Sequence, residues 1–127
     1  MTDGTGATTD ASQALWSTVR TSVAWLDAAN GTGEHERAMR LMKLAEEAGE
    51  VMAAYIGTTG QNPRKGVTHT REDVAAELCD VIITAATALH GFSDDPAATL
   101  ERHARRVAAR IDAARGDAAR IDAPGTG

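Results

Sequence analysis

Residues 41–56 read LMKLAEEAGEVMAAYI, and this stretch decides the fold class. Its apolar residues recur every three or four positions, the spacing that gathers side chains on one side of an α-helix. At about 100° per residue, the side predicted to face the core carries Leu41, Leu44, Ala48, Val51 and Tyr55. The alternation of period two that marks a half-buried strand is missing here and in the rest of the chain. The sequence therefore predicts an all-α protein.

Two predicted helices occupy the first half of the chain, and each ends at a glycine. The first spans residues 11–29 and ends at Asn30-Gly31, a pair that favours a left-handed helix cap. The second contains the quoted stretch, begins near residues 32–34, continues through about residue 56 and ends at Gly57. The buried stripe of the first helix is predicted to carry Leu15, Val19, Val23 and Leu26.

Two further helices follow the polar segment 58–69, which is too rich in Gly and Pro for regular structure. Thr70 is placed to cap the third helix, and Asp73 is placed to complete a capping box. The third helix then runs to Gly91, and Asp95-Pro96 is a start signal for the fourth.

We expect these helices to form a four-helix bundle. Hydrophobic residues make up 43% of the 127 residues, and about half of them are alanine, so one chain has a thin core. The apolar residues of the fourth helix step by four and three from Leu100 to Ile121, a seam for a partner helix. The sequence predicts a homo-oligomer with a helical domain at 11–115, a disordered tail at 1–10 and a helix extension with a flexible tail at 116–127.

The composition excludes several function classes. The longest uncharged apolar run, residues 81–89, is far shorter than the roughly 20 residues that cross a bilayer, so we expect no membrane insertion. The single cysteine, Cys79, cannot form an internal disulfide, and no secretory signal is visible, so we expect a cytoplasmic protein. A net charge of −5 disfavours binding to duplex nucleic acid, which needs a dense basic face.

Acidic residues cluster at helical spacing on the second and third predicted helices. Glu46, Glu47 and Glu50 project as one group opposite the predicted core side, while Glu77 and Asp80 are three apart within an apolar helix. A solvent-exposed acidic surface is the alternative, and the repetition on two helices disfavours it. Because too few basic residues lie nearby to neutralise five acids, the pattern indicates a hard divalent cation, Mg²⁺ or Mn²⁺.

The motif Glu46-Glu47-x-x-Glu50, followed after 26 residues by Glu77-x-x-Asp80, resembles the EExxE…ExxD signature of the MazG-like all-α nucleoside triphosphate pyrophosphohydrolases. The resemblance covers residues 12–112 and includes the flanking text LMKLAEEAGEV and AAELCDVIITA. It implies an all-α bundle that forms a homodimer or a dimer of dimers. It also implies Mg²⁺-dependent hydrolysis of an NTP or dNTP to the monophosphate and pyrophosphate.

The resemblance assigns roles to the five acids. Four match the metal-ligand positions of the family motif: Glu47, Glu50, Glu77 and Asp80. Glu46 matches the additional first acid, and we expect it to position or deprotonate the water that attacks the α-phosphorus. It is the predicted catalytic residue.

Four residues are candidates for substrate binding. Arg64 and Lys65 are cations in the Gly-rich segment and suit the phosphates of the leaving group. Lys43 lies beside the carboxylates, and Trp25 is an aromatic residue that can stack on a nucleobase, as first-helix aromatics do in some relatives. Thr84 stands where some family members carry an aromatic residue, so the base and sugar specificity stay open.

Two other classes of function remain beside the enzyme. One is a protein that binds metal and nucleotide on the same scaffold without turnover and partners through the fourth helix. The other is a purely structural helical oligomer, whose thermal stability would not respond to Mg²⁺ or Mn²⁺.

Overall fold

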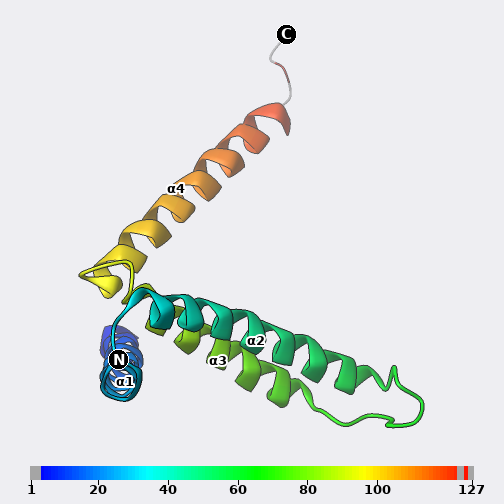
Figure 1. The fold of residues 1–127 in the computed structure, drawn as a ribbon. Coiled ribbons are helices and arrows are strands. Elements are labelled where there is room, and N and C mark those ends of the chain that lie inside the picture. Colours follow the sequence, from blue (N-terminus) through cyan, green and yellow to red (C-terminus); the bar gives the residue numbers. More distant parts are fainter. Residues whose placement is uncertain (1–3, 123–124, 126–127) are drawn as a thin grey trace. The chain divides into compact units, whose positions relative to one another are not determined.

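The computed structural model describes residues 4–122 and 125, with side chains from Asp10 onward. The described residues form four α-helices and no strand (Figure 1), which confirms the all-α prediction. The helices are α1 (Gly4–Asn30), α2 (Glu34–Thr59), α3 (Arg71–Leu89) and α4 (Pro96–Asp122). Two compact units divide between Asp94 and Asp95, so the first holds α1 to α3 and the second holds α4. Among the described residues, no helix is long and apolar enough to cross a membrane.

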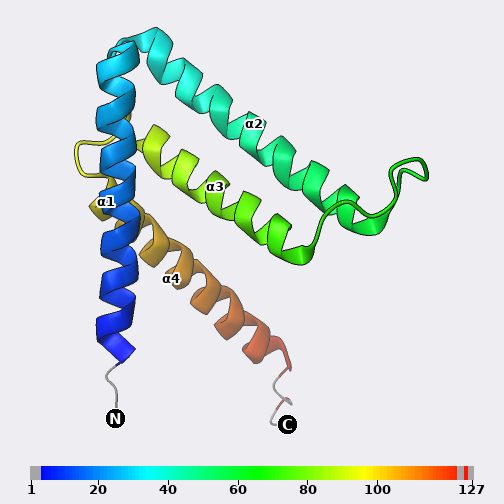
Figure 2. The same ribbon diagram turned by 90° about the horizontal axis from the view of Figure 1, so that it is seen from below.

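Helices α2 and α3 form an antiparallel hairpin, and they make the most extensive contact in the first unit (Figures 1 and 2). Helix α1 contacts α3 and lies across the end of the hairpin where α2 begins (Figure 2). The segment 60–70 closes the opposite end. The hairpin therefore brings Glu47, in the middle of α2, close to Glu77 of α3.

Local capping fixes the ends of these helices as the sequence predicts at two places. Thr70 Oγ1 accepts a hydrogen bond from Asp73 N at 3.2 Å, and Asp73 Oδ2 accepts one from Thr70 N at 2.8 Å. This reciprocal pair is the predicted capping box. Gly31 has a positive φ of 80° and its N–H donates to Asp27 O at 2.9 Å, so the predicted stop at Asn30-Gly31 is confirmed.

Two predicted helix boundaries were wrong. Helix α2 continues through Gly57 to Thr59 and ends at Gly60, whose φ of 65° supplies the left-handed cap. Gly57 serves packing instead, because the returning chain crosses it and Thr68 N donates to its carbonyl oxygen at 2.9 Å. Helix α1 begins at Gly4 rather than near Ala11.

The buried core is small, and its largest fully buried side chain is Val19 of α1. The other buried residues of the first unit are Ala54, Ala86, Thr87 and Ala88. Alanines at these contacts allow the helix backbones to approach closely, which explains why so few large side chains are enclosed. In α1, Leu15, Val23 and Leu26 are half-buried beside Val19, as predicted.

The predicted core side of α2 was wrong at its outer edge. Leu41 is 46% exposed and Tyr55 is 60% exposed, although both were expected to face the core. Helix α3 instead contacts the side of α2 that includes Leu44, Glu47 and Ala54. Ala48 and Val51 are half-buried as predicted, and Ala54 is the one buried residue of α2.

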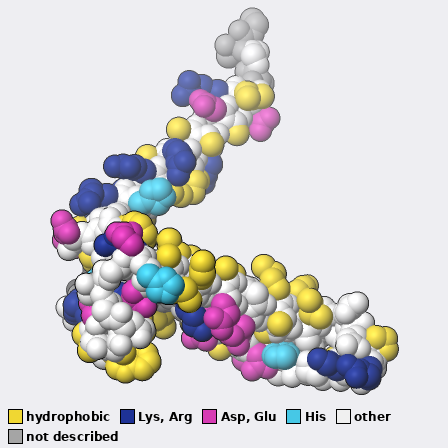
Figure 3. Space-filling model, in the orientation of Figure 1, with side chains coloured by type: hydrophobic (Ala, Val, Ile, Leu, Met, Phe, Trp, Pro, Cys, Tyr) yellow, Lys and Arg dark blue, Asp and Glu magenta, His cyan; other side chains and the backbone are white. Residues whose placement is uncertain are grey.

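The two edges of the hairpin carry different kinds of side chain (Figure 3). In this view, acidic side chains gather along one edge of the hairpin, and hydrophobic side chains form a band along the opposite edge. The exposed hydrophobic residues of the hairpin include Leu41, Met52, Ile56, Leu78 and Ile82.

Candidate metal centre

Three carboxylates converge in the middle of the α2–α3 hairpin. Glu47 projects from α2, and Glu77 and Asp80 project from consecutive positions of one face of α3. One oxygen from each side chain lies within 4.8 Å of the other two. The structure thus brings together three of the four predicted metal ligands.

Burial makes this arrangement unfavourable without a cation. The side chain of Glu47 is only 13% exposed, although the sequence predicted it on the side away from the core. Glu77 Oε2 is buried and has no hydrogen-bond partner among the described residues. Leaving a buried polar atom unsatisfied costs about 1 to 3 kcal/mol, and more when the group is charged. The triad is therefore a candidate site for a cation.

Lys43 supplies the nearest positive charge. Its Nζ lies 3.1 Å from Glu46 Oε1 and 3.4 Å from Glu47 Oε1. The hydrogen bond to Glu46 is the main cause that raises the pKa of Lys43 above its usual value. One ammonium group cannot neutralise the triad together with Glu46 and Glu50, so the cluster keeps a negative potential.

Glu50, the fourth predicted ligand, lies one turn after Glu47 at the exposed edge of the cluster. The neighbouring Glu47 carboxylate is the largest cause that raises the pKa of Glu50, and the charge of Glu77 adds to it. These influences place the Glu50 carboxyl beside the triad. A bound cation would oppose these influences and lower the pKa of Glu50.

The donor set fits a hard divalent cation. All of its donors are carboxylate oxygens, and the triad includes no His or Cys. Mg²⁺ and Mn²⁺ favour such ligands and commonly retain several waters, so three or four carboxylates are sufficient. The exposed side of Asp80 leaves room for waters or for a substrate oxygen.

An apolar cavity of about 620 Å³ adjoins the triad on the same side of the hairpin. Trp25 and Leu26 of α1, Met39 of α2 and Ile83 of α3 line it. Its polar lining residues include Ser22, Asn30, His35, Lys43, Thr84 and Thr87. Lys43 lies between the two features, because it lines the cavity and its ammonium group contacts the Glu47 carboxylate.

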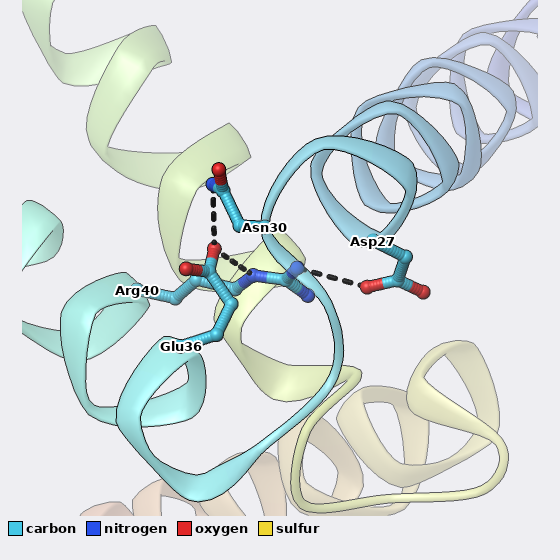
Figure 4. A network of polar contacts seen from close by, with 4 residues as sticks. All are labelled: Asp27, Asn30, Glu36 and Arg40. Atoms are coloured by element: carbon cyan, nitrogen blue, oxygen red, sulfur yellow. Dashed lines mark hydrogen bonds and ion pairs between the residues drawn. The ribbon is translucent and has the colours of Figure 1, made fainter.

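A polar network joins Asp27, Asn30, Glu36 and Arg40 (Figure 4), and the last three of these residues line the apolar cavity. Arg40 Nη2 lies 2.8 Å from Asp27 Oδ1, and Arg40 Nε donates to Glu36 Oε1 at 3.0 Å. Asn30 Nδ2 donates to the same Glu36 oxygen at 3.2 Å. Burial lowers the pKa of Arg40, but the hydrogen bonds to both carboxylates outweigh it and raise the pKa. The network ties α1 to α2 and so holds two walls of the cavity together.

The substrate-binding candidates separate into two pairs. Lys43 and Trp25 line the apolar cavity. Arg64 and Lys65 are exposed in the segment that closes the far end of the hairpin (Figure 2). About 18 Å of helix rise separates Glu47 from the end of α2, so the structure does not bring these two cations to the triad of the same chain.

The sequence prediction missed the other lining residues of the cavity. Met39 lies four positions before Lys43, on the same side of α2 as Glu46 and Glu50, so an extension of the acidic stripe toward the N-terminus could have found it. Ile83 and Asn30 carry no comparable signal, because three separate helices have to meet before they share a cavity.

No protein-family model, curated protein or solved structure matches the chain.

Proposed function

We propose that the chain is a divalent-metal-dependent pyrophosphohydrolase that cleaves a nucleoside triphosphate or its deoxy form to the monophosphate and pyrophosphate. The observation that carries this proposal is the Glu47, Glu77 and Asp80 triad, in which Glu77 Oε2 is buried without a partner among the described residues. The resemblance of the EExxE…ExxD motif to the MazG-like enzymes supplies the reaction class.

The layout of charges and apolar surface supports a nucleotide as the substrate. A triphosphate needs cations at one end of its site, and a nucleobase needs an apolar wall at the other. The carboxylate cluster and the apolar cavity are adjacent, and Lys43 touches both. We propose that the triphosphate lies over the triad and that the base enters the cavity against Trp25.

The triad with Glu50 would hold Mg²⁺, or Mn²⁺ in its place. When bound, the metal neutralises the charge of the phosphate oxygens. Lys43 is positioned to bind a phosphate oxygen, and this exchange would release Glu46 from the ion pair at 3.1 Å. Glu46 then accepts the proton of the water that attacks the α-phosphorus, while the bond to pyrophosphate breaks. Trp25 and the Arg40 network orient the base.

We also propose that the protein acts as a homo-oligomer, a homodimer or a dimer of dimers. The small core and the exposed hydrophobic band of the hairpin support this, because a second copy would cover apolar side chains that one chain leaves in water.

A panel of NTPs and dNTPs with Mg²⁺ or Mn²⁺ tests the proposal. We expect pyrophosphate release by the wild type and a loss of at least a hundredfold in Glu47→Gln and Asp80→Asn, since each removes a metal ligand. Glu72→Gln, an exposed acid on α3 outside the cluster, is the matched control and should retain activity. Wild-type rates in both ligand variants would refute the proposal, and stoichiometric metal and nucleotide binding without product would favour the binding-protein alternative.

A further inference from the structure

Helix α4, taken by itself, carries a continuous apolar seam. The seam repeats every 3.5 residues on average, which is the period of a coiled coil rather than of a single surface helix. Leu100 is 45% exposed, Ile111 is 51% exposed and Ile121 is 83% exposed. The seam consists of Leu100, Ala104, Val107, Ile111, Ala114, Ala118 and Ile121. These apolar side chains are removed from water only when a partner helix packs against them.

We propose that α4 pairs with α4 of a second copy of the chain as an antiparallel coiled coil. In this arrangement Ile111 of one copy faces the partner's Ala114, and the two helices are related by a two-fold axis between these layers. The proposal concerns α4 alone and does not depend on the pyrophosphohydrolase activity.

The alternation of large and small residues selects the antiparallel direction. Each layer then combines one alanine with one branched residue: Ala104 with the partner's Ile121, Val107 with the partner's Ala118, Ile111 with the partner's Ala114, and the three symmetry equivalents. Each pair of facing seam residues then has a similar total volume, and such pairs pack without voids. A parallel pair in register would place Ala against Ala and Ile against Ile, which leaves cavities in some layers and crowds others.

The charges beside the seam select the same direction. In the antiparallel pair Arg110 lies opposite the partner's Asp117, and symmetry repeats this attraction. In a parallel pair Arg110 would face the partner's Arg115, and Asp117 would face the partner's Asp122. Like charges would therefore oppose the parallel arrangement.

One kind of same-sign contact remains in the antiparallel pair, between Glu101 and the partner's Asp122, and symmetry repeats it. Within its own helix, Glu101 already binds Arg105, with Arg105 Nη2 at 2.7 Å from Glu101 Oε1. This neighbour reduces the repulsion at the ends of the pair, where solvent also screens it.

Cysteine cross-linking tests the direction of the pair in the full chain. In a Cys79→Ser background, Ala104→Cys and Ile121→Cys chains are prepared separately, one with a mass tag, and then mixed and oxidised. We expect a disulfide between the two different chains and none between identical ones, because identical positions lie about 25 Å apart in the antiparallel pair. Cross-links between identical chains would contradict the antiparallel direction. The absence of any cross-link would contradict the pairing of two α4 helices. That result is expected if another helix of the same chain, or a different protein, covers the seam.

Charge reversal provides a second test by sedimentation equilibrium. We expect Arg110→Glu to raise the dissociation constant about tenfold, because it creates two repulsive contacts with Asp117. Arg106→Glu makes the same charge change away from the seam and serves as the control. The double variant Arg110→Glu with Asp117→Arg should restore association. Tighter association of Arg110→Glu would instead indicate a parallel pair, and equal effects of both single variants would overturn the proposed contact.

Discussion

Glu47 and Glu77 belong to different helices, yet their carboxylates lie within 4.8 Å of each other and of Asp80. The Glu77 carboxylate reaches this position with Oε2 buried and without a hydrogen-bond partner among the described residues. Such a pair of like charges opposes folding when no cation is bound. Folding and metal binding should therefore be coupled, and this coupling can be measured without knowledge of the substrate.

The first prediction concerns Glu77→Gln. This variant should melt a few degrees higher than the wild type in EDTA, because it removes a buried charge beside Glu47. Added Mg²⁺ or Mn²⁺ should raise the melting temperature of the wild type and leave that of the variant unchanged. Calorimetry with and without metal checks both effects. Glu72→Gln should behave as the wild type, and an equal metal response in Glu77→Gln would contradict the proposed ligand.

The second prediction concerns Trp25, which is 70% exposed and lines the apolar cavity. Trp25→Ala should weaken nucleotide binding about tenfold through the lost stacking surface and should leave Mn²⁺ binding and stability nearly unchanged. Titration calorimetry with a nonhydrolysable triphosphate measures the change. Trp16→Ala is the comparison, since Trp16 is half-buried and its loss should lower stability. Unaltered nucleotide affinity in Trp25→Ala would contradict the proposal that the nucleobase binds in this cavity.

The third prediction concerns Arg40, whose side chain is 13% exposed and joins Asp27 to Glu36. Arg40→Met should lower the free energy of unfolding by about 2 kcal/mol, because it leaves two partly buried carboxylates without their cation. Arg105→Met breaks the exposed pair with Glu101 and should cost less than about 1 kcal/mol. Urea unfolding at neutral pH compares the two. Similar losses would show that the network contributes no more than a surface ion pair.

The fourth prediction concerns the pH dependence of stability at the start of α3. The backbone N–H of Thr70 lowers the pKa of Asp73 below its usual value of 3.8, and the Thr70 hydroxyl adds to this effect. The Asp73 carboxylate therefore stabilises the folded state above that value, and this contribution disappears as the pH falls through the lowered pKa. The stability difference between wild type and Asp73→Asn should be present at pH 7 and should shrink as the pH falls below 3.8. A difference independent of pH would contradict the role of the charge.

The fifth prediction compares two helical glycines. Gly57→Ala should destabilise the chain, because the new methyl group would overlap His69 Nδ1 and Thr68 Oγ1. Gly116→Ala meets no atom within 4 Å and should stabilise α4 by about 1 kcal/mol through its higher helix propensity. Circular dichroism during urea unfolding reports both variants. Equal effects of the two substitutions would show that helix propensity alone decides them.

Local sequence signals predicted the helix ends well where nearby residues form hydrogen bonds with the terminal backbone groups. Thr70 and Asp73 form the expected capping box, and Gly31 ends α1 as expected. The acidic triad could also be predicted, since acid pairs spaced by three or four on two neighbouring helices converge when those helices pack.

Other features depend on tertiary packing that periodicity does not encode. Leu41 and Tyr55 belong to the apolar stripe of α2, but the stripe is wide and its pattern does not say which edge contacts α3. Gly57 resembles a helix end in the sequence. In the structure it lies within α2, and its lack of a side chain lets the segment near Thr68 pack against the helix. The apolar cavity requires three helices at once, so neither Ile83 nor Asn30 stands out in the sequence alone.

The most direct test of the proposed activity is ³¹P NMR of the products formed from the best nucleoside triphosphate in H₂¹⁸O with Mg²⁺. We predict a monophosphate that carries the ¹⁸O label, together with unlabelled pyrophosphate, and no products with Glu47→Gln. Orthophosphate in place of pyrophosphate, or the label in pyrophosphate, would contradict attack at the α-phosphorus and with it the proposed function.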